Sequence, residues 1–340
     1  MTRRLIGRLL VGSCLALVLL VVAGYGVFRW GNAPYAPQIE PAQSRPVTIP
    51  EGASFRQIAT LLEREHLIKS QWVFRFLGRM TGSDRRIVAG EYALHPGMTP
   101  SEVLHELVSG RVVLYSITIP EGYTIDQMAE VFGQKGLADP KEFRKLAHDP
   151  AFAKTLHLEA TSLEGYLFPN TYRFAKRTRI ADILKTMVEG FWGVLTPALQ
   201  ARAKDLNMTV HQVLTLASVV EKETGAAQER ELVAGVFHNR LRRHIPLQSD
   251  PTVIYGLTNF DGNIRKKDLS SASPYNTYRI QGLPPGPIAN PGAGAIRATL
   301  YPTPTPYLYF VSRNDGTHEF SATLEDHNRA VDRYQRRPSS

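Results

Sequence analysis

The sequence predicts an α+β fold: a transmembrane helix, then small strand-and-helix modules, then a mixed α/β domain with a mainly helical core. Three observations support this: an uncharged apolar run near the N-terminus, a repeated strand–turn–helix pattern, and helical periodicities that end in a hairpin pattern. A length of 340 residues allows two or three domains. We divide the chain into a tail at 1–8, a membrane anchor at 9–28, a linker at 29–45, a first domain at 46–157 and a second domain at 158–340.

The N-terminal segment has the length and charge pattern of a membrane anchor. Residues 9–28 carry no charge, and a helix of that length crosses a bilayer. Arg3, Arg4 and Arg8 precede the run, which favours a cytoplasmic N-terminus. A signal peptide cleaved near Ala23 is the alternative, but the apolar run is long for one. We expect a single-pass protein of the cell inner (plasma) membrane, with its larger part on the periplasmic, or outer, face.

The composition restricts the partners and cofactors. A net charge of +9 suggests an anionic partner such as nucleic acid, lipid or an anionic polymer. No zinc-finger spacing or aromatic RNA-binding signature accompanies this charge, so we do not expect nucleic acid. Cys14 is the sole cysteine, and His238 and His244 are not four apart as a helical metal pair would be. We therefore expect no metal and no cofactor.

A short motif occurs twice in the first domain. Thr48-Ile49-Pro50-Glu51-Gly52 returns seventy positions later as Thr118-Ile119-Pro120-Glu121-Gly122. Each copy leads into a predicted helix with Ser54 or Thr124 as its N-cap. Small βα units of this kind resemble LysM-type modules, which bind glycans that contain N-acetylglucosamine. A packing scaffold without a ligand is the alternative interpretation.

An apolar helical run in the second domain ends in a glutamate. The apolar residues from Val210 to Val220 recur at helical spacing, and Glu221 continues their stripe. Glu223 lies roughly 200° further around the helix. Loss of solvation and the helix C-terminus both favour the protonated form of Glu221, as a general acid requires. The alternative is a half-solvated glutamate paired with Lys222 or an arginine.

Periodicity and turn residues predict the remaining elements of this part of the chain. We expect a helical connection at 141–158, helices at 180–195, 197–206 and 229–243, a hairpin of 307–313 with 319–321, and a last helix through Tyr334. Long polar loops lie around Gln248 and Asp250, and around Tyr275, Asn276 and Tyr278. Loops of this length are often functional, and these polar residues suit a wall that faces a hydroxyl-rich substrate.

Several motifs together resemble one family. They are Leu163-Glu164-Gly165-Tyr166-Leu167-Phe168-Pro169, Ala217-Ser218-Val219-Val220-Glu221-Lys222-Glu223-Thr224, the stretch 247–256, Tyr275-Asn276-Thr277-Tyr278, the stretch 282–288 and the stretch 305–311. In this combination and order they resemble the endolytic murein transglycosylases, the YceG-like family, and the resemblance covers residues 1–335.

The resemblance implies a lytic transglycosylase. Its reaction cleaves the β-1,4 bond between N-acetylmuramic acid and N-acetylglucosamine inside peptidoglycan strands, leaves 1,6-anhydromuramyl ends, and would end the elongation of nascent strands. Glu221 matches the family's catalytic glutamate. Our candidate substrate-binding residues are Glu223, Glu164, Gln248, Asp250, Tyr275, Asn276 and Tyr278. The expected partners are peptidoglycan glycan strands and the lipid bilayer, and peptidoglycan synthases are further candidates.

Two alternatives remain open. A hydrolytic muramidase would need a second carboxylate, with Glu223, Glu164 or Asp250 as candidates, whereas a non-catalytic scaffold would bind peptidoglycan without cleaving it. No second carboxylate lies at a spacing that the sequence ties to Glu221. This favours attack by the substrate's own C6 hydroxyl, with Glu221 serving as acid and then as base.

Overall fold

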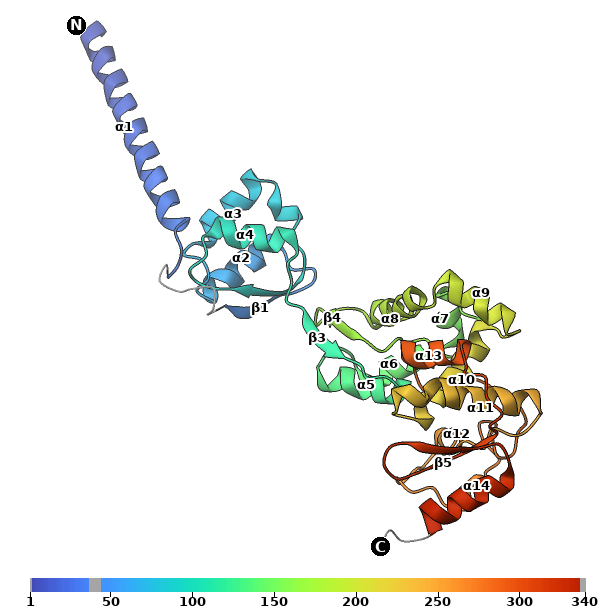
Figure 1. The fold of residues 1–340 in the computed structure, drawn as a ribbon. Coiled ribbons are helices and arrows are strands. Elements are labelled where there is room, and N and C mark those ends of the chain that lie inside the picture. Colours follow the sequence, from blue (N-terminus) through green and yellow to red (C-terminus); the bar gives the residue numbers. More distant parts are fainter. Residues whose placement is uncertain (1, 37–43, 337–340) are drawn as a thin grey trace. The chain divides into compact units, whose positions relative to one another are not determined.

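The computed structural model describes residues 2–36 and 44–336. The chain forms two compact units (Figure 1). The first unit comprises residues 1–115 with 175–177, and the second comprises 116–174 with 178–340. Small two-stranded sheets accompany many helices, so the predicted α+β class is confirmed.

The N-terminal apolar run is helical. Helix α1 extends over Thr2–Gly31, and its portion Gly12–Gly31 is long and apolar enough to cross a membrane by length and composition. The predicted anchor at 9–28 falls within this helix. Part of the predicted linker, residues 37–43, lies outside the described residues.

The first unit is a two-stranded antiparallel sheet with helices packed on it. Strand β1 (Arg45–Ile49) pairs with β2 (Gly90–Leu94), and Val47 lies opposite Tyr92. Its helices are α2 (Phe55–Arg64), α3 (Gln71–Met80) and α4 (Pro100–Ser109), with a 3₁₀ turn at Ser83–Arg85. One apolar core includes Ile49, Leu62 and Phe74. Ser54 and Gln57 form a capping box at α2, which confirms the predicted cap.

The second copy of the repeated motif belongs to the second unit. Strand β3 (Tyr115–Thr118) pairs with β4 (Thr171–Phe174), and the N–H of Ile119 donates to the carbonyl of Asn170 at 2.9 Å. The compact units therefore divide at 115/116, and the predicted domain boundary at 157/158 stays a prediction. The division depends on the pairing of two strands that lie more than fifty residues apart, and no local sequence pattern predicts such a pairing.

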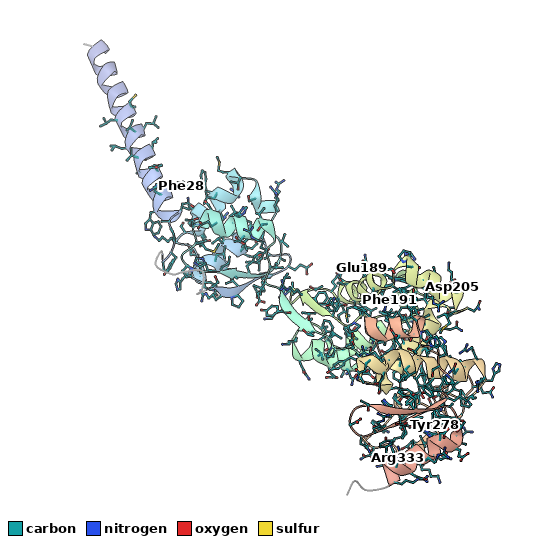
Figure 2. The ribbon with its side chains drawn as sticks, viewed as in Figure 1. Phe28, Glu189, Phe191, Asp205, Tyr278 and Arg333 are labelled. Atoms are coloured by element: carbon teal, nitrogen blue, oxygen red, sulfur yellow. The ribbon has the colours of Figure 1, made fainter. Side chains whose placement is uncertain are left out.

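The second unit is mainly helical. Its helices are α5 (Ile125–Gln134), α6 (Pro140–Ala147), α7 (Pro150–Thr155), α8 (Ile180–Val194), α9 (Pro197–Asp205), α10 (Val210–Glu223), α11 (Arg230–Arg242), α12 (Asp250–Tyr255), α13 (Ala293–Leu300) and α14 (Leu324–Val331). Shorter turns lie at Ala227–Glu229, Asp268–Ser270 and Asp332–Arg336. The side chain of Phe191 on α8, labelled in Figure 2, is buried in this unit.

Two predictions about helices need correction. The expected connection at 141–158 is two helices, because Asp149 caps a new helix and Pro150 occupies its first turn. Helix α10 is buried on all sides over residues 213–220, since α9, α11, α12 and α13 pack around it. The predicted single apolar stripe is therefore incomplete, and Glu223 does not face open solvent.

The C-terminal hairpin is confirmed. Strand β5 (Tyr309–Ser312) pairs antiparallel with β6 (His318–Ser321). Asn314 in the connecting turn has a φ of 64°, a left-handed conformation that asparagine tolerates better than most residues. Thr323 accepts a hydrogen bond from the N–H of Asp326 and caps α14.

Candidate active site

Glu221 lies at the C-terminal end of α10, held between two donors. Its side chain is only 6% exposed. The guanidinium of Arg230, at the start of α11, donates to Oε1 at 3.2 Å, and the N–H of Gly292 donates to Oε2 at 2.9 Å. Two donors from different elements therefore fix the orientation of this carboxyl group.

Opposing effects act on the proton of Glu221. Burial is the largest and raises the pKa of Glu221 above its usual value, as the sequence analysis expected. The hydrogen bond from Gly292 and the charges of Arg230 and Lys222 lower it, whereas the charge of Glu121 raises it. The net direction is upward, which suits a group that must deliver a proton.

A second carboxylate lies at this site. Nη2 of Arg230 contacts Oε2 of Glu121 at 3.5 Å as well as Oε1 of Glu221 at 3.2 Å. Glu121 comes from the second copy of the repeated motif, one hundred positions before Glu221. From the sequence we expected Glu223, Glu164 or Asp250 as a second carboxylate, and Glu121 was not among these candidates.

Backbone contacts hold the motif turn against α10. The N–H of Gly122 donates to the carbonyl of Asn290 at 2.9 Å, and the N–H of Asn290 donates to the carbonyl of Tyr123 at 2.9 Å. Lys222 donates to the carbonyl of Gly122 at 3.4 Å. Gly122 has a φ of 74°, and a Cβ there would lie 3.4 Å from Cγ of Glu221. The turn therefore forms one wall of the site.

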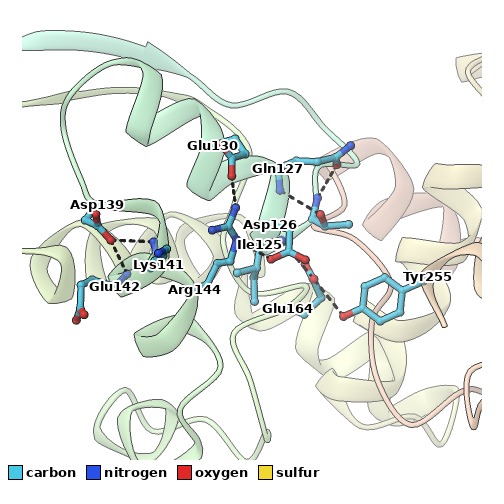
Figure 3. A network of polar contacts seen from close by, with 11 residues as sticks. Ile125, Asp126, Gln127, Glu130, Asp139, Lys141, Glu142, Arg144, Glu164 and Tyr255 are labelled. Atoms are coloured by element: carbon cyan, nitrogen blue, oxygen red, sulfur yellow. Dashed lines mark hydrogen bonds and ion pairs between the residues drawn. The ribbon is translucent and has the colours of Figure 1, made fainter. Parts of the chain in front are cut away.

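Glu164 lies behind this wall and is buried. Figure 3 shows its carboxyl group beside Ile125 and Tyr255. The carboxyl group accepts hydrogen bonds from the N–H of Ile125 at 3.2 Å, from the side chain of Asn290 at 2.7 Å and from the hydroxyl of Tyr255 at 3.2 Å. Burial raises the pKa of Glu164 to about 8, although these donors oppose the rise. Glu164 thus connects the start of α5 with the loop that carries Gly292.

Four of the predicted substrate-binding residues meet in a separate pocket. Glu223, Gln248, Asp250 and Tyr278 line a cavity of about 350 Å³, together with Arg240, Leu247, Tyr309, Phe310, Leu324 and His327. Tyr278 is labelled in Figure 2 near the C-terminal elements, and its hydroxyl donates to Asp250 at 2.7 Å. Burial raises the pKa of Glu223 to about 7, and a hydrogen bond from Ser249 opposes the rise.

The two remaining candidates lie elsewhere. Asn276 is fully buried, and its amide donates to the carbonyls of Leu269 and Ser271 at 3.0 and 2.9 Å. It holds the loop in which it lies. Tyr275 packs edge-on against Tyr255, with ring centroids 4.8 Å apart.

Sequence patterns do not indicate a functional role for Glu121, Arg230, Asn290 or Gly292. In the sequence, Glu121 is only one residue of a repeated motif, and Arg230 is only one charged residue at the start of a predicted helix. Their role depends on contacts between segments about ten to one hundred and seventy positions apart. Spacing rules that operate within one helix or strand cannot detect such contacts.

The fold and the site define an α+β protein with a buried glutamate presented at a helix end, and comparison with known proteins identifies its family. The model of the YceG-like family matches residues 47–333, and the chain therefore belongs to this family. An endolytic murein transglycosylase of Bacillus subtilis strain 168 is 33% identical over 326 residues, which cover 91% of this chain and 90% of that protein.

Two further comparisons agree with this assignment. An endolytic murein transglycosylase of Streptococcus pneumoniae strain D39 is 34% identical over 317 residues. The match covers 84% of this chain and 57% of that longer protein. A crystal structure of a YceG-like protein from Listeria monocytogenes is similar with a TM-score of 0.59 and 34% identity, and the match covers 85% of this chain and 99% of that one.

Proposed function

We propose that this protein is a membrane-anchored endolytic lytic transglycosylase that cleaves glycan strands of peptidoglycan with Glu221 as its catalytic acid and base. The observation that carries the proposal is the buried Glu221 carboxyl held by Arg230 and Gly292. The names of the relatives support the choice of substrate. Cleavage within nascent strands would end their elongation.

The proposed reaction needs one titrating carboxyl group. Glu221 in its acid form gives its proton to the glycosidic oxygen as the bond from that oxygen to C1 of the muramic acid breaks. The C6 hydroxyl of the same sugar then attacks C1 and gives its proton to the Glu221 carboxylate, which restores the acid. An attack within one sugar unit gains from proximity, worth up to about 7–11 kcal/mol in favourable cases.

The pocket around Glu223 is the best candidate for a sugar subsite. A concave site with polar groups among aromatic rings is typical of ligand binding. Glu223, Gln248, Asp250 and Tyr278 supply the polar groups, and Tyr309 supplies a further ring. Glu164 and Asn276 use their hydrogen bonds within the protein. We therefore expect them to support the substrate-binding region rather than to contact sugar directly.

A hydrolytic muramidase is the second candidate, because Glu121 supplies a second carboxylate at the site through its contact with Arg230. Two carboxylates on either side of a scissile bond are the usual requirement of hydrolysis. Product analysis in oxygen-18 water separates the two reactions. The transglycosylase yields unlabelled 1,6-anhydromuramyl ends, whereas labelled reducing muramyl ends as the main product would identify a hydrolase.

We propose that α1 anchors the protein in the membrane, with the residues that follow α1 on the outer face. The basis is the length of the apolar helix and the arginines before it. This would place Glu221 on the side where peptidoglycan lies and near its synthases. A reporter fused after Ser340 should be active only outside the cytoplasm, and activity only inside would contradict the orientation.

We also propose that the first unit binds glycan in the manner that its LysM-like motif suggests. A cavity of about 320 Å³ lies beside the first motif turn, lined by residues that include Gly52, Ile58 and Leu61. In a full-length Glu221→Gln background, Leu61→Arg should fill this cavity and weaken binding to purified glycan strands. Unchanged binding with an unchanged melting temperature would leave the first unit as a scaffold.

A further inference from the structure

Arg230 is shared between two acids at the candidate active site. Its Nη2 lies 3.2 Å from Glu221 and 3.5 Å from Glu121. The three side chains differ in exposure: Glu221 is 6% exposed, Arg230 is 17% exposed and Glu121 is 46% exposed. A buried acid is thus connected through one cation to an acid that reaches solvent.

The surrounding backbone leaves room for Glu121 in this position. A Cβ on Gly292 would lie 1.9 Å from Oε1 of Glu121, so only a glycine fits there while Glu121 keeps its place. The same Gly292 donates its N–H to Glu221. The loop that orients the buried acid therefore also lies directly against the second one.

We propose that Glu121 is a positioning residue of the active site, which holds Arg230 between two carboxylates and thereby keeps Glu221 able to act as the acid. This inference rests on the proposed role of Glu221. One guanidinium nitrogen contacts both carboxylates, so Glu121 and Glu221 converge on a cation. A base for a water molecule would instead face the scissile bond, with room for that water between the two acids.

The charges around Glu221 give the inference a measurable consequence. Arg230 comes from α11, Glu121 from the turn before α5, and Lys222 from α10 itself; the backbone N–H of Gly292 precedes α13. Glu229, the neighbour of Arg230 in the sequence, instead contacts His318: Nδ1 of His318 lies 2.7 Å from Oε2 of Glu229. Without the charge of Glu121, the charge of Arg230 would act on Glu221 alone and favour its carboxylate form.

The sign of the pH effect follows from the role of an acid. A general acid is active while protonated, so activity falls as pH rises through the pKa of Glu221. Neutralising Glu121 lowers that pKa, because Glu121 raises it in the intact site. The alkaline limb of the pH profile should therefore move to lower pH. If the limb moves down by one pH unit, the variant should lose about tenfold in activity at pH values above the alkaline limbs of both proteins.

The test compares kcat/KM against pH for full-length protein in detergent with purified glycan strands. Glu121→Gln should move the alkaline limb to lower pH and keep activity on the acidic side. Glu121→Asp, which keeps the charge, should return the limb towards its original position. Glu189→Gln is the control, because Glu189 lies exposed on α8 and lines neither proposed binding cavity, and it should give the profile of the unchanged protein.

Three results would overturn the inference. A profile for Glu121→Gln identical to that of the unchanged protein would show that Glu121 has no role in the site. An equal loss at every pH, with an unchanged melting temperature, would indicate a catalytic base instead. An equal limb shift in Glu121→Asp and Glu121→Gln would show that charge is not the cause. Failure of the proposed function is separate, since it would appear as full activity of Glu221→Gln or as labelled hydrolytic ends.

Discussion

The two copies of the Ile-Pro-Glu-Gly motif have the same local structure in different surroundings. Gly52 and Gly122 have φ values of 72° and 74°, and each copy leads into a helix with a capping box, from Ser54 in one and Thr124 in the other. A Cβ on Gly52 would meet nothing within 4 Å, whereas a Cβ on Gly122 would meet Glu221 and Lys222. Local sequence therefore determines the turn, and distant segments determine whether it belongs to a site.

The glutamates of the two turns show the same difference. Glu51 lines an open cavity of about 320 Å³ in the first unit. Glu121 shares Arg230 with Glu221, and the loop before α13 packs on its turn. One turn is thus available to a ligand on its own, while the other serves as a wall for an acid on α10. The following predictions test this contrast.

The largest effect is expected at the acid that the second turn faces. Glu221→Gln keeps the shape of the side chain and removes its titrating proton, so turnover should fall by at least about 10²–10⁴-fold. Glu223→Gln is the matched variant two positions away and should cost less, because Glu223 faces the other pocket. The release of products from glycan strands measures the turnover of both variants, and thermal unfolding measures their stability. Normal turnover of Glu221→Gln would disprove the mechanism, and its failure to fold would favour a structural role.

The next effect separates the two turns through their glycines. Alanine at either position has to adopt a positive φ, which costs roughly 1–2 kcal/mol of stability. Gly122→Ala also places a methyl group 3.4 Å from Cγ of Glu221, so kcat should fall, because the methyl group restricts the space beside the reacting carboxyl group. Gly52→Ala should leave the rate unchanged. Melting temperatures and kcat for both variants test the contrast, and it fails if both lose activity equally.

The elements that the sequence predicted well are those determined by neighbours along the chain. Helix α10 begins at Val210, where the predicted apolar periodicity begins, and Thr209 caps it, because a side-chain acceptor followed by apolar residues at helical spacing is a local signal. The hairpin at 309–321 likewise follows from its turn residues. Glu221 was identified because it ends such a segment and lies within a specific motif.

The remainder of the site depends on contacts that one sequence does not reveal. Arg230 is nine positions after Glu221, and Glu121 is one hundred before it; only the packing of α11 and of the second turn brings them together. The same limitation applies to the compact units, because the pairing of β3 with β4 assigns the second motif to the second unit. Glu164 was chosen from a motif, but its burial behind the wall follows from three separate segments.

The smallest effect concerns the acid behind the second turn. Glu164 has a pKa of about 8 in the folded protein against a usual value of 4.5, so the folded state holds a proton that the unfolded state has lost between these values. The free energy of unfolding should therefore fall as pH rises across this range, by at most about 1.4 kcal/mol per pH unit. Glu164→Gln retains an acceptor for Ile125 and Asn290 and has no proton to lose, so it should remove the part of this dependence that Glu164 causes, while the part due to Glu223, whose pKa is about 7, remains. Urea unfolding at pH 5.5 to 8.5 measures the slope in both proteins. Equal slopes would mean that Glu164 is ionised in the folded state, stabilised by the donors from Ile125, Asn290 and Tyr255 that surround it.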